Sequence, residues 1–186
     1  MGKLTSRLAS RNETRKYGLP SLVVSSSLAE KYAAACHELE PPLDRDLVIA
    51  GGVLHDIGKI RELQLTPTGA EYSESGALIG HMLQGRDIVR EAAAACGLTG
   101  EKLLRLEHIV ISHQRLPEWG APKPPMTPEA LLVHYADDMD AKLQMMICAL
   151  VADAKTGPLT TTRNPLKQKF YRGACAADKS IAEGDE

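Results

Sequence analysis

Residues 47–59 read LVIAGGVLHDIGK. The apolar run from Leu47 to Leu54 is typical of a central helix that is buried on nearly all sides. Glycine commonly follows the last residue of a helix, so we expect this helix to end at Gly58. His55 and Asp56 would then lie side by side at a helix end, where an imidazole and a carboxylate can bracket one metal ion.

The same pair of residues has a simpler explanation. A histidine at a helix C-terminus is stabilised by the helix dipole, and the aspartate beside it can be an ordinary surface residue. Lys59 adds a cation that a phosphate group would favour, which points toward a functional site. Whether the pair belongs to such a site therefore depends on the other histidines and acids of the chain.

The size and charge of the chain limit its function. It has 186 residues, enough for one domain with a sizeable core, and a formal net charge of -2. A net charge this close to zero means that the surface is not basic overall, so any contact with a polyanion must come from a local basic patch. Aromatic residues make up only 4%, which argues against base-stacking platforms. No signal-peptide pattern or window of membrane-spanning length is visible, so we expect a soluble cytoplasmic protein.

The four cysteines are widely spaced and form no CxxC pair. Each lies in an alanine-rich setting, so we expect small buried thiols in a reducing compartment. They are Cys36, Cys96, Cys148 and Cys175.

Periodic apolar residues predict five core helices and an all-α fold. Asp44 is a suitable N-cap for the helix that carries the His-Asp pair, and Thr127-Pro128-Glu129 is a strong helix start. No strand-like alternation is visible, and Arg61–Ser73 and Arg115–Thr127 are typical of loops. The expected helices cover Ser25–Leu39, Asp44–Ile57, Ser75–Cys96, Thr99–His113 and Pro128 to the region of Lys155.

The sequence also predicts local features of the second and third helices. Gly51 and Gly52 lower the intrinsic stability of the second helix, and close helix packing is the expected reason for both. In the third helix we expect Gly97 to cap the end and a buried side made of Leu78, Met82, Ile88 and Val89.

The same pattern divides the chain into three segments. Residues 1–17 are charged and aperiodic, and we expect a basic N-terminal arm. Residues 18–172 hold the helices and form the domain. Residues 173–186 are expected to be a disordered tail.

The remaining histidines and acids recur on several of the expected helices. His81 lies in the third helix, His108 and His113 lie in the fourth, and Asp137 lies in the fifth. Each alone is more often a core residue with a hydrogen-bond partner than a metal ligand. A set spread over four helices is different, because helix bundles build metal sites from inward side chains on several helices.

Nitrogen and carboxylate ligands without cysteine suit one or two divalent ions such as Mn, Fe, Ni, Co or Mg, and they disfavour a structural zinc site. Such an ion can polarise a phosphoryl oxygen and lower the pKa of a bound water to about 7. The expected partners are therefore a phosphorylated small molecule or a short nucleic acid, and not a membrane.

The order of these residues resembles the HD superfamily of metal-dependent phosphohydrolases. Four blocks are similar, in the same order, to the HD domain of YhaM-type 3′–5′ exoribonucleases, and the resemblance covers residues 18–172. It implies an HD-domain helical bundle of about five core helices. The blocks are LVIAGGVLHDIGKIREL (47–63), IGH (79–81), HIVISH (108–113) and LVHYADDMDAK (132–142).

The resemblance also implies a role for each matching residue. Asp56 would bridge two ions and Lys59 would contact the scissile phosphate, so these two are the expected catalytic residues. The other matches complete the site: His55 and Asp137 would hold one ion, His81 and His113 would hold the other, and His108, Gln114 and Arg115 would support the ligands or contact the substrate.

Two positions depart from the family pattern. The superfamily usually has a further histidine on its first helix, and Ser21–Ser25 contains none. His37 lies too close to His55 to replace it. Where the family often has Ser-His-His-Gly, this chain has Gln114 after His113. Either one ion is held more weakly than the other, or the domain is a degenerate relative.

The leading hypothesis is a phosphohydrolase in which metal-activated water attacks a phosphoester of a nucleotide or a short oligonucleotide. The alternative is a degenerate HD domain that binds metal or nucleotide without turnover. A third possibility is a helical interaction protein whose polar pairs are only structural. YhaM-type proteins carry an OB domain before the HD domain, and we expect no room for one here.

The loop Arg115–Thr127 is the best candidate for substrate contact, because it carries Arg115, Trp119 and Lys123. Long loops in compact domains are often functional, although an ordinary proline-rich connector explains this segment equally well.

Overall fold

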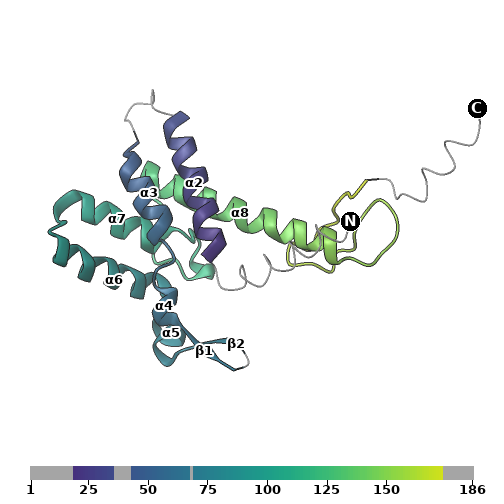
Figure 1. Ribbon diagram of the computed structural model, residues 1–186, viewed down its shortest axis with the longest axis horizontal. Coiled ribbons are helices and arrows are strands. Elements are labelled where there is room, and N and C mark those ends of the chain that lie inside the picture. Colours follow the sequence, from purple (N-terminus) through teal and green to yellow (C-terminus); the bar gives the residue numbers. More distant parts are fainter. Residues whose placement is uncertain (1–18, 36–42, 68, 174–186) are drawn as a thin grey trace, which may run out of the picture. The chain divides into compact units, whose positions relative to one another are not determined.

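The computed structural model describes residues 19–35, 43–67 and 69–173 (Figure 1). Most of this part of the chain is helical, which confirms the expected all-α class. The chain divides into two compact units, Met1–Asp138 and Met139–Glu186. The helices are α2 (Leu19–Ala35), α3 (Arg45–Leu54), α4 (Lys59–Glu62), α5 (Glu74–Ile79), α6 (His81–Cys96), α7 (Gly100–Ser112) and α8 (Pro128–Ala152).

The core of the first unit lies where α3, α6, α7 and the start of α8 meet. Ile109 and Val110 of α7 are fully buried there and pack with Leu47 of α3 and Val133 of α8. This core holds the end of α3, where the His-Asp pair lies. A smaller cluster joins α2 to α3 and α8 through Ala29, Ala33, Val48 and Ala136.

The start and the packing of α3 confirm the sequence predictions. The Asp44 side chain accepts a hydrogen bond from the backbone N–H of Leu47 at 3.1 Å and so caps the helix. A Cβ at Gly51 would lie 2.7 Å from an α7 side chain, and one at Gly52 would lie 3.0 Å from the backbone of Ser26. Both glycines are therefore needed for close helix packing.

The end of α3 differs from the prediction. The helix ends at Leu54 rather than at Ile57, and Gly58 has φ -63°, an ordinary right-handed value, at the start of α4. A Cβ on Gly58 would lie 1.8 Å from the carbonyl oxygen of His81 and 2.6 Å from the backbone nitrogen of Gly85. The expectation that this glycine caps α3 is wrong, because the close approach of α6 is what requires it.

The expected helix Ser75–Cys96 is two helices. Gly80 adopts φ +78°, a left-handed conformation that ends α5 and precedes α6. His81 consequently becomes the first residue of α6 rather than a residue in the middle of a helix.

The break also changes which residues are buried. Leu78 is 87% exposed, so its expected burial is wrong. Met82 and Val89 are buried as expected, and Ile88 is half-buried. Gly97 has φ +75° and caps α6, which confirms the prediction for that end.

Arg61–Ser73 is not a plain loop. It holds an antiparallel hairpin of β1 (Leu63–Thr66) and β2 (Gly69–Tyr72), in which Leu63 pairs with Tyr72. Leu65 is 83% exposed and Tyr72 is 65% exposed. β1 alternates apolar and polar residues over only four positions, and β2 shows no clear alternation, so the hairpin leaves little signal in the sequence.

The predicted loop Arg115–Thr127 is present and contains one 3-10 turn, Pro117–Trp119. Pro128 begins α8, and the Thr127 hydroxyl accepts a hydrogen bond from the backbone N–H of Ala130 at 3.2 Å. The predicted helix start is thus confirmed. The helix ends at Ala152, slightly before the expected end.

In the second unit, the segment after α8 folds back on itself. The backbone N–H of Thr160 donates to the carbonyl of Phe170 at 2.9 Å, and both residues are buried. Leu159 pairs with Tyr171 in an isolated antiparallel bridge. Among the described residues, none of the helices combines the length and the apolar character that a bilayer span requires.

Some predictions fall outside the described residues: the basic arm at 1–17, the end of the first helix at Leu39, the tail after Gly173, and Cys36 and Cys175. α2 begins at Leu19, earlier than expected. Cys96 is exposed and Cys148 is half-buried, so the expected burial is wrong for Cys96.

Candidate metal centre

The ends of two helices and the start of a third supply most of the site. His55 directly follows α3 and precedes Asp56, His81 begins α6, and His113 directly follows α7. Asp137 lies within α8. Neighbouring residues inside a helix point about 100° apart. The end of a helix removes this restriction, so His55 and Asp56 can approach the same point.

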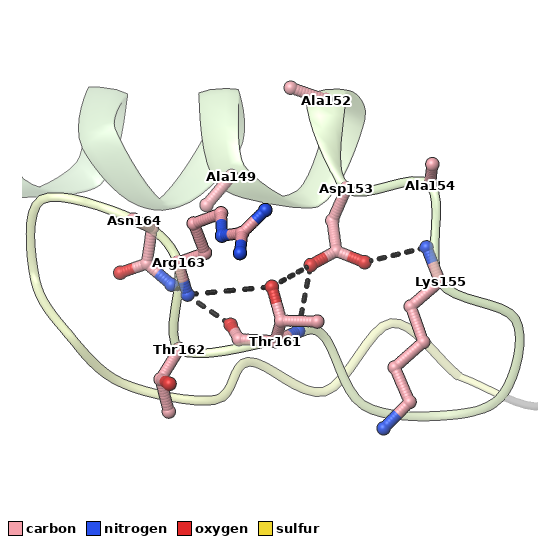
Figure 2. A pocket seen from close by; sticks show the side chains of 9 residues that line it. All are labelled: Ala149, Ala152, Asp153, Ala154, Lys155, Thr161, Thr162, Arg163 and Asn164. Carbon is pink, nitrogen blue, oxygen red and sulfur yellow. Dashed lines mark hydrogen bonds between the residues drawn. The ribbon is translucent and has the colours of Figure 1, made fainter.

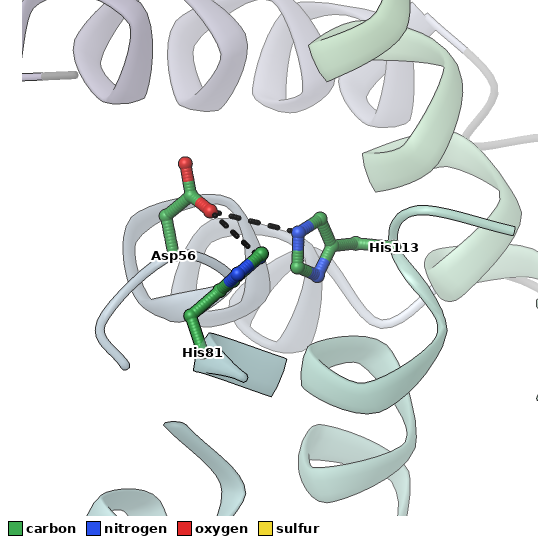
Figure 3. A group of neighbouring side chains, drawn as sticks. All are labelled: Asp56, His81 and His113. Atoms are coloured by element: carbon green, nitrogen blue, oxygen red, sulfur yellow. Dashed lines mark ion pairs between the residues drawn. The ribbon is translucent and has the colours of Figure 1, made fainter. Parts of the chain in front are cut away.

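Asp56, His81 and His113 point toward one another (Figure 3). Asp56 Oδ1 lies 3.5 Å from His81 Nε2 and 3.6 Å from His113 Nε2. The three ligand atoms all lie within 4.8 Å of one another, which makes the triad a candidate metal site. Two ligand atoms that each lie about 2.1 Å from one ion are about 3.5 Å apart at a near-tetrahedral angle, so the spacing fits an ion.

His55 and Asp137 lie beside the triad. His55 Nε2 is 3.6 Å from Asp56 Oδ2 and 3.5 Å from Asp137 Oδ1. The ring centroids of His55 and His113 are 4.9 Å apart. The two oxygens of Asp56 therefore face different histidines: Oδ1 faces His81 and His113, and Oδ2 faces His55. A carboxylate that bridges two ions needs this arrangement.

Each imidazole is held by a hydrogen bond from its other nitrogen. Nδ1 of His55 lies 2.9 Å from the carbonyl oxygen of Gly52, and Nδ1 of His113 lies 2.8 Å from that of Val110. A carbonyl oxygen only accepts, so each Nδ1 carries the hydrogen and donates it. In the neutral ring, Nε2 is then left with a lone pair that faces Asp56, as metal ligation requires.

Glu62 holds the imidazole of His81 in the same way, and this residue was not identified from the sequence. This buried carboxylate accepts hydrogen bonds from Nδ1 of His81 at 3.0 Å and from its backbone N–H at 2.8 Å. A carboxylate behind a ligating histidine fixes the ring and strengthens its basicity. Glu62 lies inside the quoted block at residues 47–63, but nothing local marks it as buried.

His134 is a second residue that the sequence did not reveal. It is buried, and its Nδ1 donates to the carbonyl oxygen of His113 at 2.7 Å. The α8 helix thereby holds the backbone of His113 in place. His134 lies three residues before Asp137, and nothing in the sequence distinguished it from an ordinary core histidine.

Two atoms of the triad, Asp56 Oδ1 and His81 Nε2, are buried and have no hydrogen-bond partner among the residues that the structure describes. An unpaired buried polar atom of this kind costs about 1–3 kcal/mol, and more when the group is charged. Both atoms face the centre of the triad, and a cation there would satisfy them together. The residues present therefore fit a divalent metal ion.

The groups around Asp56 keep its carboxyl ionised, and the ionised carboxylate attracts a cation. Burial opposes ionisation of Asp56, but the imidazoles of His113 and His55 and the ammonium of Lys59 hold the pKa of its carboxyl far below the usual range. Lys59 Nζ lies 2.6 Å from Asp56 Oδ2. Burial lowers the pKa of His113 below its usual value. Burial also works against a charge on His55, yet Asp137 and Asp56 together raise the pKa of that ring.

The three other predicted residues lie around this centre in different ways. Gln114 Nε2 is 3.3 Å from His113 Nε2. Arg115 has φ +64° and donates from Nη1 to the Tyr135 hydroxyl at 3.3 Å. His108 does not join the cluster, because its Nε2 accepts the backbone N–H of Met126 at 2.8 Å and so secures the end of the Arg115–Thr127 loop.

The comparisons with known proteins agree with this geometry. The family model of the HD domain matches residues 22–142. The chain is 46% identical over 136 residues to the 3′-5′ exoribonuclease YhaM of Bacillus pumilus, covering 73% of this chain and 43% of that protein. It is 44% identical over 141 residues to the protein of the same name in Bacillus subtilis, covering 75% of this chain and 44% of that one.

The chain therefore spans less than half the length of the curated relatives it matches. No solved structure is similar enough to count as a match. The matched residues 22–142 include every predicted ligand, and they carry the helix ends at which those ligands lie. On this match and on the identity to its relatives, the chain belongs to the HD domain family.

Proposed function

We propose that this protein is a metal-dependent phosphohydrolase that cleaves a phosphoester of a nucleotide or of the 3′ end of a short oligonucleotide. The observation that carries the proposal is the triad of Asp56, His81 and His113. Three side chains converge from just beyond the ends of α3 and α7 and from the start of α6, and two of their buried atoms have no hydrogen-bond partner among the described residues. Such a cluster is costly unless a cation completes it.

The proposed ligands form two overlapping sets. His81, His113 and Asp56 would hold one ion, and His55, Asp137 and Asp56 would hold a second. Mixed imidazole and carboxylate ligands suit Mn, Fe, Ni, Co or Mg. A divalent ion in such a site polarises a phosphoryl oxygen and lowers the pKa of water to about 7.

The protein side chains supply positioning and charge. The Lys59 ammonium lies at the edge of the site beside Asp56, and 38% of its side chain is exposed. It can therefore reach a phosphate that arrives from solvent and offset the negative charge on the phosphoryl oxygens. Gln114 and Arg115 follow His113 directly, and we propose that they contact the substrate next to the reacting phosphate.

The choice of substrate is supported by the relatives, which are named as 3′-5′ exoribonucleases. They share the HD part of their sequence with this chain, and the ligand blocks are within that part. We propose that the HD domain covers residues 18–172, which adds residues 18–21 and 143–172 to the matched region.

The test compares hydrolysis with and without metal. The purified chain is stripped with EDTA, supplied with Mn, Co or Mg, and assayed on bis-p-nitrophenyl phosphate, mononucleotides and a 5′-labelled short RNA. Activity is expected only with metal, and Asp56→Asn and His113→Ala are expected to lose at least a hundredfold in kcat. Asp46→Asn is the matched control, because Asp46 is an exposed acid on α3, the helix that precedes Asp56. Full activity in Asp56→Asn and His113→Ala would overturn the proposal.

One observation favours a second candidate function. Ser21–Ser25 contains no histidine, so the ion beside His55 and Asp137 lacks the ligand that a first-helix histidine would supply. The alternative is a degenerate HD domain that binds metal or nucleotide without turnover. Elemental analysis that finds bound metal, together with no hydrolysis of any of these substrates, would favour the alternative.

A further inference from the structure

The second unit contains a basic segment that the family match does not reach. The HD match ends at residue 142, whereas Ala154–Gly173 carries five Lys or Arg residues and no Asp or Glu. The net charge of this segment is +5 in a chain whose total is -2. Positive charge concentrated in this way is typical of a local surface for a polyanion.

Four of the five cations have no counter-ion within the part of the chain that the structure describes. Arg172 is paired with Asp153 at 2.8 Å. The side chains of the other four make no hydrogen bond or ion pair with the described residues, and all are exposed or nearly so: Lys155, Arg163, Lys167 and Lys169. Their charges are therefore available to an external partner.

The segment is held in a defined shape by Asp153. The Asp153 carboxylate accepts hydrogen bonds from the hydroxyl of Thr161 at 2.6 Å, from its backbone N–H at 2.7 Å and from the backbone N–H of Lys155 at 2.9 Å (Figure 2). Asn164 closes the next turn by donating to the carbonyl oxygen of Gln168 at 2.7 Å. The cations are thus presented by an ordered backbone rather than by a free tail.

An open pocket of about 660 Å³, lined in part by Lys155 and Arg163, lies between the last turns of α8 and Thr161–Asn164. Figure 2 shows the Arg163 side chain lying between the α8 helix and this loop, with no hydrogen bond to its guanidinium. Thr162 and Asn164 add polar groups to the lining. A guanidinium with all of its donors free is well suited to a phosphate group.

An exposed aromatic ring accompanies the charges. Phe170 is buried, and neighbouring residues of an extended segment point to opposite sides. Lys169 and Tyr171 therefore share the outward side, and Tyr171 is 71% exposed. A cation beside an exposed ring suits a single-stranded nucleic acid, because unpaired bases can stack on the ring while phosphates contact the cation.

We propose that residues 155–172 form a binding surface for the sugar-phosphate backbone of single-stranded RNA. The identification of the polyanion as RNA depends on the proposed function, whereas the existence of a polyanion surface does not. The inference deepens that function, because a second contact surface implies a polymer substrate rather than a mononucleotide.

The test measures RNA binding separately from catalysis. The full chain is titrated in EDTA against a fluorescein-labelled 15-nucleotide single-stranded RNA, and anisotropy is followed between 50 and 200 mM KCl. The variant Arg163→Gln/Lys167→Gln/Lys169→Gln is expected to bind at least tenfold more weakly. Its slope of log K against log salt should fall by about 2, since each phosphate contact on a single strand contributes about 0.7.

Two further variants make the measurement specific. Lys31→Gln/Arg45→Gln/Lys102→Gln removes the same charge from exposed positions of the first unit and should keep the wild-type slope. Tyr171→Leu should weaken binding severalfold without changing the slope, because stacking does not release counterions. Circular dichroism and melting curves check that each variant is folded.

The outcomes distinguish this inference from the proposed function. RNA binding in EDTA with the expected loss in the triple variant supports the surface even if no substrate is hydrolysed. Hydrolysis of bis-p-nitrophenyl phosphate with Mn, combined with no RNA binding or with an unchanged slope in the triple variant, overturns the surface and leaves the function. Binding to phosphatidylserine vesicles but not to RNA would also overturn it.

Discussion

Glu62 accepts two hydrogen bonds from a single residue, His81: one from the ring Nδ1 at 3.0 Å and one from the backbone N–H at 2.8 Å. The carboxylate thus orients both the imidazole and the first turn of α6. Because the first residues of a helix have backbone N–H groups without an intrahelical partner, a buried acid there also completes the helix end. The hairpin that follows Glu62 returns the chain to α5, so that α6 can begin beside it.

The first prediction concerns Glu62. Glu62→Ala removes the group that fixes the His81 ring, and the affinity for Mn is expected to fall about 10–100-fold. Isothermal titration calorimetry measures the change directly. Glu91→Ala is the control, because Glu91 forms only an exposed pair with Arg61. Wild-type affinity in Glu62→Ala would show that the carboxylate does not position the ligand, and Glu62→Gln should recover part of the loss.

The second prediction concerns metal and stability. A ligand that binds only the folded protein raises the free energy of unfolding by about 2.7 kcal/mol when its free concentration is about one hundred times its Kd. Added Mn is therefore expected to raise the melting temperature of the wild-type chain. His81→Ala should show a much smaller rise and His108→Ala a normal one, because His108 lies outside the triad. An equal rise in both variants would place the ion elsewhere.

The third prediction concerns Gly58. A Cβ there would lie 1.8 Å from the carbonyl oxygen of His81, and backbone atoms cannot move aside as a side chain can. Gly58→Ala is expected to lower the free energy of unfolding by about 3 kcal/mol or more, measured by urea denaturation. In Gly51→Ala the added methyl group meets the side chain of Ile109 rather than backbone atoms, so a smaller loss is expected. The reverse order would contradict the packing described for α6.

The fourth prediction concerns Glu129 and pH. Burial opposes ionisation of this carboxyl, but Arg105 and the backbone N–H of Asp44 hold its pKa below the ordinary value of 4.5. The folded state therefore gains stability from the ionised form above pH 4.5 and loses it as the pH falls through the lower folded value.

Glu129→Gln is accordingly expected to lower the free energy of unfolding by about 1–3 kcal/mol at pH 7, and the difference from wild type should shrink as the pH is lowered. Urea titrations at several pH values measure this. Glu118→Gln, at an exposed position, should show no such trend. A difference that stays constant with pH would mean that the Arg105 pair is not the cause.

Much of the fold could be predicted because its signals are local. Periodic apolar residues predicted α7, and a Thr-Pro-Glu start predicted α8. Asp44 predicted the beginning of α3. Helix starts and amphipathic stripes depend on residues a few positions apart, so the sequence shows them directly.

The incorrect predictions share a different cause. Gly58 and Gly80 are both glycines near a helix end, and the sequence does not show which of them adopts positive φ. Gly80 does so and splits a helix, whereas Gly58 is needed because α6 packs against it. The hairpin was missed because its four-residue strands are too short to show a clear alternation, and their pairing is not visible in the sequence. Each of these features depends on a contact, or on the lack of one, between segments distant in the chain.

The sequence by itself determined the helical class and the candidate residues of the site, because helix periodicity and the order of the His and Asp residues can be read directly from it. Only the tertiary structure decided that His55, Asp56, His81, His113 and Asp137 lie together, and that Glu62 holds the His81 ring while His134 holds the backbone of His113. It also decided that four of the five cations after α8 have no counter-ion among the described residues. The physical reason is that distance and burial are set by packing between helices, which no local pattern of residues specifies.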